Sequence, residues 1–203
     1  MKLSGFSLIP FLALAGNIAQ ASPAWDEATA LAALASDTEQ KARACQVLAV
    51  VGGPDTVPAL AELLGDNQLA SYARTALEVI EDPSAGEALR AALTKLEGRL
   101  LAGVVTSIGV RGDEAALPAL QALATDADRE VAASALAALA QIGSEDALAT
   151  VLQTLQGESD ELRITAAHAT LAAAERMAKD GKTEAARDLL ESVQKADLPE
   201  HIR

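Results

Sequence analysis

The side chains that most often carry out chemistry are scarce in this sequence. It contains two histidines, His168 and His201, and one cysteine, Cys45. A zinc site needs three or four histidine, cysteine or carboxylate ligands at suitable spacing, and no such group is evident. A single cysteine cannot form a disulfide within the chain, and Cys45 lies in an apolar helical run, so we expect it to be a small core residue. We therefore expect no metal site and no cofactor.

Other patterns that carry chemistry are also missing from the sequence. There is no glycine-rich phosphate loop, no Gly-x-Ser-x-Gly elbow and no Cys-x-x-Cys-His haem-attachment motif. Carboxylates are common, but most fall at expected turns and helix starts, as Asp113 and Glu145 do. Negative charge there complements the helix dipole, which favours a structural role over a pair of catalytic acids. The sequence therefore predicts no catalytic residues and a protein that is not an enzyme.

The overall charge narrows the range of partners. The formal net charge is −13, with 29 acidic and 16 basic residues. A nucleic-acid-binding protein needs a basic surface to neutralise phosphates, and anionic lipid surfaces also attract basic segments. Half of the residues are hydrophobic but only 2% are aromatic, a composition that favours packed helices over a large sheet. We expect protein partners and no nucleic acid.

The N-terminus has the pattern of a secretory signal. Lys2 supplies a positive charge, and the apolar stretch 6–15 is too short to span a bilayer. Ala19-Gln20-Ala21 follows as a small-x-small cleavage site. We expect residues 1–21 to be a signal peptide, the protein to be exported to the periplasm or secreted, and the mature chain to have no membrane span.

An internal repeat organises the rest of the chain. Apolar runs end before Gly52, Gly109 and Gly143, and aligning them brings together Val51, Ile80, Ile108 and Ile142, which are 29, 28 and 34 residues apart. Apolar residues also recur three and seven positions earlier, the spacing of one helix face. Each step is about the length of a helical hairpin. This alignment predicts that second helices bury Leu48, Leu77, Ile108, Leu139 and Ile142.

The repeat predicts an all-α, right-handed α-solenoid of about five to six antiparallel helical hairpins, forming one domain over residues 22–203. Pro118 would lie inside a helix that began at residue 113, so we expect a late start or a kink there. The expected first helices cover residues 24–36, 55–64, 85–94, 114–124 and 145–156. The expected second helices cover residues 38–51, 68–80, 97–108, 129–142 and 160–179, and a final helix covers 183–195.

The pattern resembles HEAT-like repeats, including the short bacterial repeats of phycobilisome-lyase-type families. The residues that carry this resemblance are 126–131 with Ala135, Leu139, Ile142 and Gly143, together with the pair Leu162-Arg163. The stretch 98–111 is similar to secreted HEAT-repeat proteins of environmental bacteria, in which the array often accompanies other domains of a longer chain. The resemblance covers nearly all of residues 25–203 and implies a fold more than a function.

Second helices usually line the concave binding surface of a solenoid. The alignment gives three rows of equivalent positions there: Arg43, Tyr72, Leu100, Ser134 and Thr165; then Gln46, Thr75, Gly103, Ala137 and His168; then Val50, Val79, Ser107, Gln141 and Ala172. From these rows the candidate binding residues are Arg43, Gln46, Tyr72, Thr75, Ser107, Gln141 and His168. Two alternatives stay open, that Tyr72 only packs between repeats and that His168 is a solvated or hydrogen-bonded residue.

We therefore expect a non-catalytic exported scaffold that binds a protein partner or an adjacent domain of the same longer chain. The alternative is a lyase-like HEAT-repeat enzyme or a chromophore-handling subunit. That role would need a pocket with convergent polar groups and aromatic side chains, and only Trp25 and Tyr72 follow Phe11 as aromatics. A deep cavity near Tyr72 and His168 would favour the enzyme, whereas a shallow groove would favour the scaffold.

The C-terminal segment resembles the start of another second helix. Asp197 precedes Ile202-Arg203 as Asp126 precedes Val131. We expect the chain to stop within a sixth repeat, and the apolar face of its last helix to be partly uncovered at Ala186, Leu189, Leu190 and Val193. A short natural tail after a capping helix is the alternative.

Overall fold

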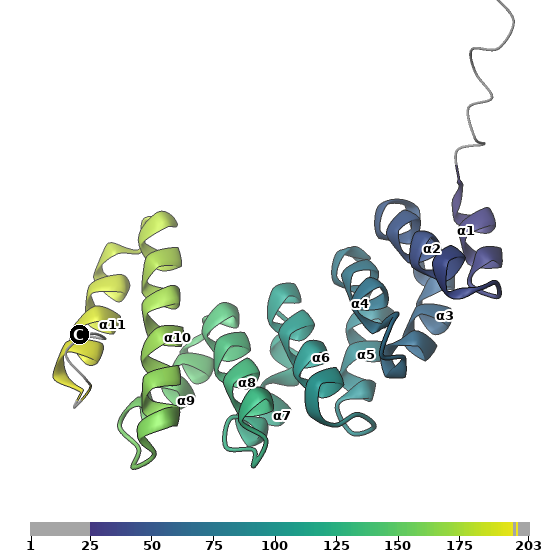
Figure 1. Ribbon diagram of the computed structural model, residues 1–203. Helices are drawn as coiled ribbons and strands as arrows, with labels where there is room; N and C mark the ends of the chain where they lie inside the picture. The colour runs from purple at the N-terminus through teal and green to yellow at the C-terminus, as the bar shows by residue number, and fades with distance from the viewer. Residues whose placement is uncertain (1–24, 197, 199–203) are drawn as a thin grey trace, which may run out of the picture.

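The computed structural model describes residues 25–196 and Leu198. The expected signal peptide, 1–21, therefore lies outside the described residues, as do Asp197 and the segment 199–203 with His201 and Ile202. No strand occurs in the part that is described. Eleven α-helices follow one another along it, as an arc of stacked hairpins (Figure 1). The expected all-α solenoid is confirmed.

The helices alternate between two layers. The helices α2, α4, α6, α8 and α10 pack side by side in one layer, and α3, α5, α7 and α9 lie on the other side of the arc (Figure 1). Their bounds are α1 Glu27–Ala33, α2 Thr38–Val51, α3 Val57–Glu62, α4 Ala70–Val79, α5 Pro83–Ala92, α6 Gly98–Arg111, α7 Leu117–Leu123, α8 Arg129–Ile142, α9 Glu145–Leu155, α10 Asp160–Lys179 and α11 Thr183–Lys195. Short 3-10 turns are η1 Pro54–Thr56, η2 Leu63–Gly65 and η3 Glu114–Ala116.

Aspartates in the turns cap the helices that follow them. The carboxylate of Asp37 accepts a 2.9 Å hydrogen bond from the backbone N–H of Gln40 at the start of α2. Asp128 accepts bonds from two N–H groups of the first turn of α8. Hydrogen bonds from the Thr29 side chain and backbone lower the pKa of Asp26, the cap of α1. The turn carboxylates therefore satisfy N–H groups that a helix leaves unpaired, as the sequence predicted.

Both prolines of the first-helix motif lie at the beginning of an α-helix. Pro118 is in the first turn of α7, after the 3-10 turn η3, and Pro58 occupies the same place in α3 after η1. Proline lacks the N–H that an interior position would need, but the first turn has no partner for that group. The late helix start expected at Pro118 is confirmed.

Burial along the second helices corrects the predicted register of α6. The buried side chains of α6 include Leu101, Val104, Val105, Ser107 and Ile108. Adding 31 to each number gives a set of α8 residues that are also buried, namely Ala132, Ala135, Leu136, Ala138 and Leu139. The equivalent of Ile108 is therefore Leu139, not Ile142 as the sequence alignment had it. The same step of 31 residues relates α4 to α6 and α8 to α10.

The error came from Gly109, which does not end its helix. It lies inside α6, which ends at Gly112, a glycine in the left-handed conformation with φ 64°. Gly109 instead marks a close approach, because a Cβ on it would lie 2.7 Å from the Cα of Ala138 in α8. The missing side chain allows α6 and α8 to pack in direct contact.

Two residues of the predicted core are less buried than expected. Ile142 is the last residue of α8 and is only partly buried. Val51 is the last residue of α2 and is 43% exposed. Both side chains lie at a helix end, where the next turn that would cover them is absent. The other expected core residues, Leu48, Leu77, Ile108 and Leu139, are fully buried.

The last helix is better covered than expected. Ala186, Leu189 and Val193 are buried on α11, which packs against α10. Only Leu190 of the predicted face is exposed. The expectation of a partly uncovered face was therefore wrong for three of its four residues, because α10 already covers them.

Cys45 lies in the core of α2, as predicted. Its side chain is fully buried, and burial raises the pKa of its thiol to about 11. The thiolate, not the thiol, reacts with alkylating agents and disulfides. Cys45 is thus shielded both by its position and by its protonation.

We expect the replacement Leu139→Ala to lower the free energy of unfolding by about 2–5 kcal/mol, the usual cost of truncating a buried leucine. Chemical denaturation followed by circular dichroism measures this. Val110→Ala, at an exposed position one repeat earlier, is the control and should change stability by less than about 0.5 kcal/mol. Equal effects from the two variants would contradict the 31-residue register.

Cys45 should resist iodoacetamide in the folded protein at pH 8, since the buried thiol stays protonated well below its pKa of about 11. After unfolding in guanidinium chloride, the same thiol should react at the rate of a free cysteine. Mass spectrometry of the alkylated protein gives both rates. Rapid alkylation of the native protein would show that α2 is not packed as described.

Candidate binding surface

Two rows of exposed positions run across the second helices. With the step of 31 residues applied to α6, every member of both rows is exposed. We call these ten residues the inner face. The first row is Gln46, Thr75, Thr106, Ala137 and His168, and the second is Val50, Val79, Val110, Gln141 and Ala172. Four of the predicted candidates, Gln46, Thr75, Gln141 and His168, thus lie in register on one surface.

Ser107 does not belong to this surface, which corrects its prediction as a binding residue. Its side chain is fully buried, and its hydroxyl donates a 2.6 Å hydrogen bond to the Glu78 carboxylate. The Arg74 guanidinium donates to the Ser107 hydroxyl and, at 2.9 Å, to the Gly103 carbonyl. Ser107 therefore joins α6 to α4, and Val110 takes its place on the inner face.

Gly103 was placed in the second row by the sequence alignment, and this assignment is also corrected. The residue is half-buried beneath the Arg74 side chain, whose guanidinium carbon would lie 2.8 Å from a Cβ at that position. Its true equivalents are Tyr72 and Ser134, in the row that begins with Arg43. The accessible residue of α6 beside Thr75 is Thr106.

Arg43 and Tyr72 lie along the edge of the inner face. The guanidinium carbon of Arg43 lies 4.6 Å from the centre of the Trp25 ring, a cation–π distance. This contact anchors the residue before α1 to α2. Tyr72 is 38% exposed on α4. A large part of its ring therefore remains available, so packing between repeats does not account for all of it.

His168 lies over an open hollow between α8 and α10. The hollow has a volume of about 330 Å³, and Ala137, Ala172 and Arg176 are among its lining residues. Its walls carry no aromatic side chain and no carboxylate. Tyr72 lies on α4, three second helices away, so the structure does not bring these two candidates together. A shallow surface with hollows replaces the deep cavity that an enzyme would need.

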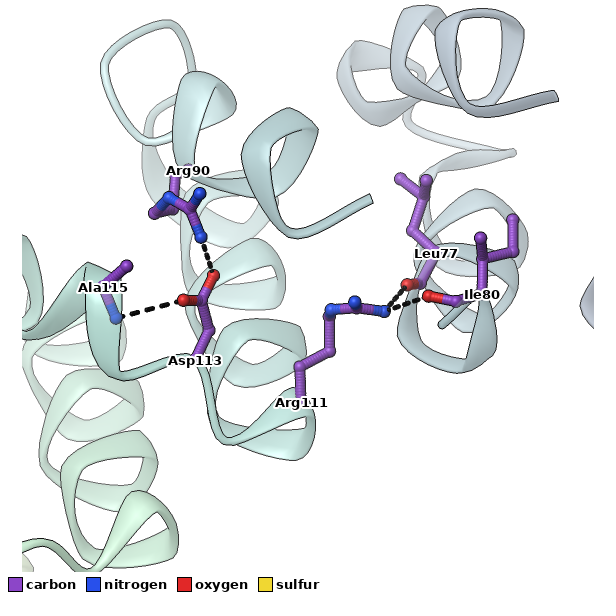
Figure 2. A network of polar contacts seen from close by, with 6 residues as sticks. All are labelled: Leu77, Ile80, Arg90, Arg111, Asp113 and Ala115. Atoms are coloured by element: carbon purple, nitrogen blue, oxygen red, sulfur yellow. Dashed lines mark hydrogen bonds and ion pairs between the residues drawn. The ribbon is translucent and has the colours of Figure 1, made fainter. Parts of the chain in front are cut away.

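Arginines that sequence reasoning treated as dispersed surface residues join neighbouring repeats. Arg111, in the last turn of α6, donates hydrogen bonds to the backbone carbonyls of Leu77 and Ile80 at 2.6 and 2.7 Å (Figure 2). These carbonyls lie at the end of α4, where the helix leaves them unpaired and the dipole favours a cation. Arg176 of α10 donates in the same way to the Ala140 carbonyl near the end of α8.

A second polar contact in Figure 2 fixes the loop after α6. The guanidinium of Arg90 pairs with one carboxylate oxygen of Asp113, and the other oxygen accepts a hydrogen bond from the Ala115 N–H. Gly86 lies directly beneath this pair, since a Cβ there would lie 3.1 Å from the Asp113 carboxylate. Together with Arg111, this pair joins three consecutive helices, α4, α5 and α6.

A larger hollow, of about 540 Å³, lies in the opposite layer between α7 and α9. It is lined mainly by threonine and glutamine side chains, of which Gln121 donates a hydrogen bond to Thr150 at 3.0 Å. Among the described residues, no group of three histidine, cysteine or acidic side chains could hold a metal ion. Nor does any helix of residues 25–198 have the length and apolar character needed to cross a membrane.

Comparison with protein families agrees with this architecture. Residues 86–172, which run from α5 into α10, match the family model for HEAT repeats. No curated protein matches the chain. The matched segment and the flanking helices share one pattern of stacked hairpins with a 31-residue step. The chain is therefore a HEAT-like repeat protein.

Proposed function

We propose that this protein is a non-catalytic scaffold, exported from the cytoplasm, that binds a protein partner or a neighbouring domain of its own chain through the inner face. HEAT repeats generally mediate protein interactions. The observation that carries the proposal is the register of the two exposed rows, which run over five successive second helices. A continuous surface of this kind suits a large partner better than a small molecule.

The chemistry of the inner face supports a protein partner. Its ten residues are valine, alanine, threonine, glutamine and one histidine, and none carries a formal charge at neutral pH if the histidine is neutral. The whole chain has a net charge of −13, so its charges lie elsewhere. A depletion of charged residues is typical of the centre of protein interfaces. Nucleic acid would instead require a basic surface.

The non-catalytic part of the proposal rests on the composition of the hollows. The hollow beside His168 offers one histidine and one arginine among alanines, with no carboxylate to orient or ionise the imidazole. A general base needs such partners within hydrogen-bond reach. The export part rests on the signal pattern of residues 1–21 alone.

Site-specific photo-crosslinking tests the proposal. Benzoylphenylalanine at Thr106 or His168 on the inner face should form protein adducts in the cells that make the protein. The same label at Glu87 of α5 or Gln153 of α9 is the matched control, because both residues are exposed on the opposite layer. Adducts only from the controls, or none from any position, would refute a protein-binding inner face.

A further inference from the structure

Three exposed valines occupy one repeat position on the inner face. Val50, Val79 and Val110, on α2, α4 and α6, are 84%, 54% and 48% exposed. Across the described residues only three other large hydrophobic side chains are exposed, namely Val51, Tyr72 and Leu190. Single exposed apolar residues are ordinary on a protein surface, but three at equivalent sites form a continuous apolar line. We call it the valine row.

The fold itself does not require valine at these positions. Gln141 takes the same place on α8, where the helix packs as well as α6 does. Valine is a weaker helix former than alanine or glutamine, and an exposed valine gains little from burial. The valine row therefore costs helix stability without adding to the core, which indicates that something else covers it.

The spacing of the valine row selects an extended segment. Neighbouring second helices are in contact, so their axes, and hence successive valines, lie about 10 Å apart. A polyproline-II chain has three residues per turn and rises about 9 Å in that turn, so every third side chain faces the same way at nearly the same spacing. In a β-strand every third residue points to the opposite face.

Hydrogen-bonding groups lie beside the valine row. Gln46, Thr75 and Thr106 form the adjacent row of the inner face, four residues earlier on each helix. The hydroxyls of Thr75 and Thr106 each donate to a backbone carbonyl of their own helix at 3.0 Å, which leaves oxygen lone pairs to accept from an N–H. An extended segment has unpaired backbone groups, whereas a bound helix satisfies its own.

Negative charge borders the valine row. Asp55, Glu81 and Glu114 are exposed in the loops that follow α2, α4 and α6, beside the negative ends of the helix dipoles. Residues 25–127 contain 15 acidic and 7 basic residues, a net charge of −8. Intramolecular hydrogen bonds already hold Arg74, Arg90 and Arg111. This border would attract lysine and arginine.

We infer that the valine row binds an extended, polyproline-II-like segment of a partner protein, with aliphatic side chains at every third residue and basic residues beside them. The aliphatic side chains pack on Val50, Val79 and Val110, and the backbone bonds to the adjacent threonine and glutamine row. The basic residues face Glu81 and Glu114. This inference rests on the proposed scaffold function and names the partner segment.

Fluorescence anisotropy with a labelled peptide tests the inference. The probe carries three Leu-Pro-Ser units flanked by two lysines at each end, and the protein with Val50, Val79 and Val110 all changed to Thr is the variant. Threonine keeps the shape and helix propensity of valine but removes its apolar character. The triple variant should bind about tenfold more weakly or worse, because the valines lose their apolar contacts. Val51→Thr, exposed but outside the row, should bind within about twofold of the unchanged protein.

Charge and conformation supply two further readouts. Glu81→Lys with Glu114→Lys should weaken binding about tenfold at low salt, whereas Glu87→Lys on α5 should not. A peptide of the same composition with leucines at alternate positions should bind more weakly. Equal binding by the triple valine variant, tighter binding of a helical peptide, or no binding up to about 1 mM probe would overturn the inference. Crosslinks from Thr106 would still support the scaffold in each of those cases.

Discussion

The direct contact between α6 and α8 at Gly109 and Ala138 is the constraint on which the remaining surface depends. The absence of a side chain at Gly109 lets the two backbones approach until a Cβ would meet Ala138 at 2.7 Å. Neighbouring second helices also meet through small residues such as Ala73, Ala135 and Ala166, all of which are fully buried. Small residues allow close helix packing in one register. Because the register repeats every 31 residues, exposed side chains fall into straight rows.

Polar bonds between repeats remove charge from the inner face. Arg111 spends its guanidinium on the carbonyls at the end of α4, and Arg74 bonds to the Gly103 carbonyl and the Ser107 hydroxyl. Each bond satisfies a group that would otherwise be unpaired, and each places a cation where the structure itself holds it. The inner face is left with hydroxyl, amide and aliphatic groups, while exposed carboxylates border it. The proposed binding of an apolar segment with basic neighbours follows from this division.

The sequence was sufficient to predict most of the helices because their beginnings are marked by capping residues. The bounds of α2 and α8 agree with the prediction at both ends, where Asp37 and Asp128 cap the first turn and a glycine follows the last. The prediction failed at the end of α6, because glycine is common after a helix and Gly109 resembled such a terminator. One misplaced glycine shifted α6 by three residues, put Ser107 on the surface and hid the valine row. Gly112-Asp113 was the better signal, since an acidic cap follows that glycine. The contacts of Arg74 and Arg111 could not be predicted, because they join residues about 30 positions apart through tertiary geometry.

Cysteine scanning of the second helices tests the inner face and its 31-residue register most directly. Single cysteines are placed at Thr75, Thr106, Ala137 and His168, and in separate variants at the residues that follow them, Ala76, Ser107, Ala138 and Ala169. Cys45 can stay in place, because its thiol is buried. The account predicts that the first four react with iodoacetamide at nearly the rate of a free thiol. The second four, all at buried positions, should react about a hundredfold more slowly or not at all. Fast alkylation at position 107 together with protection at position 106 would contradict the register and the surface built on it.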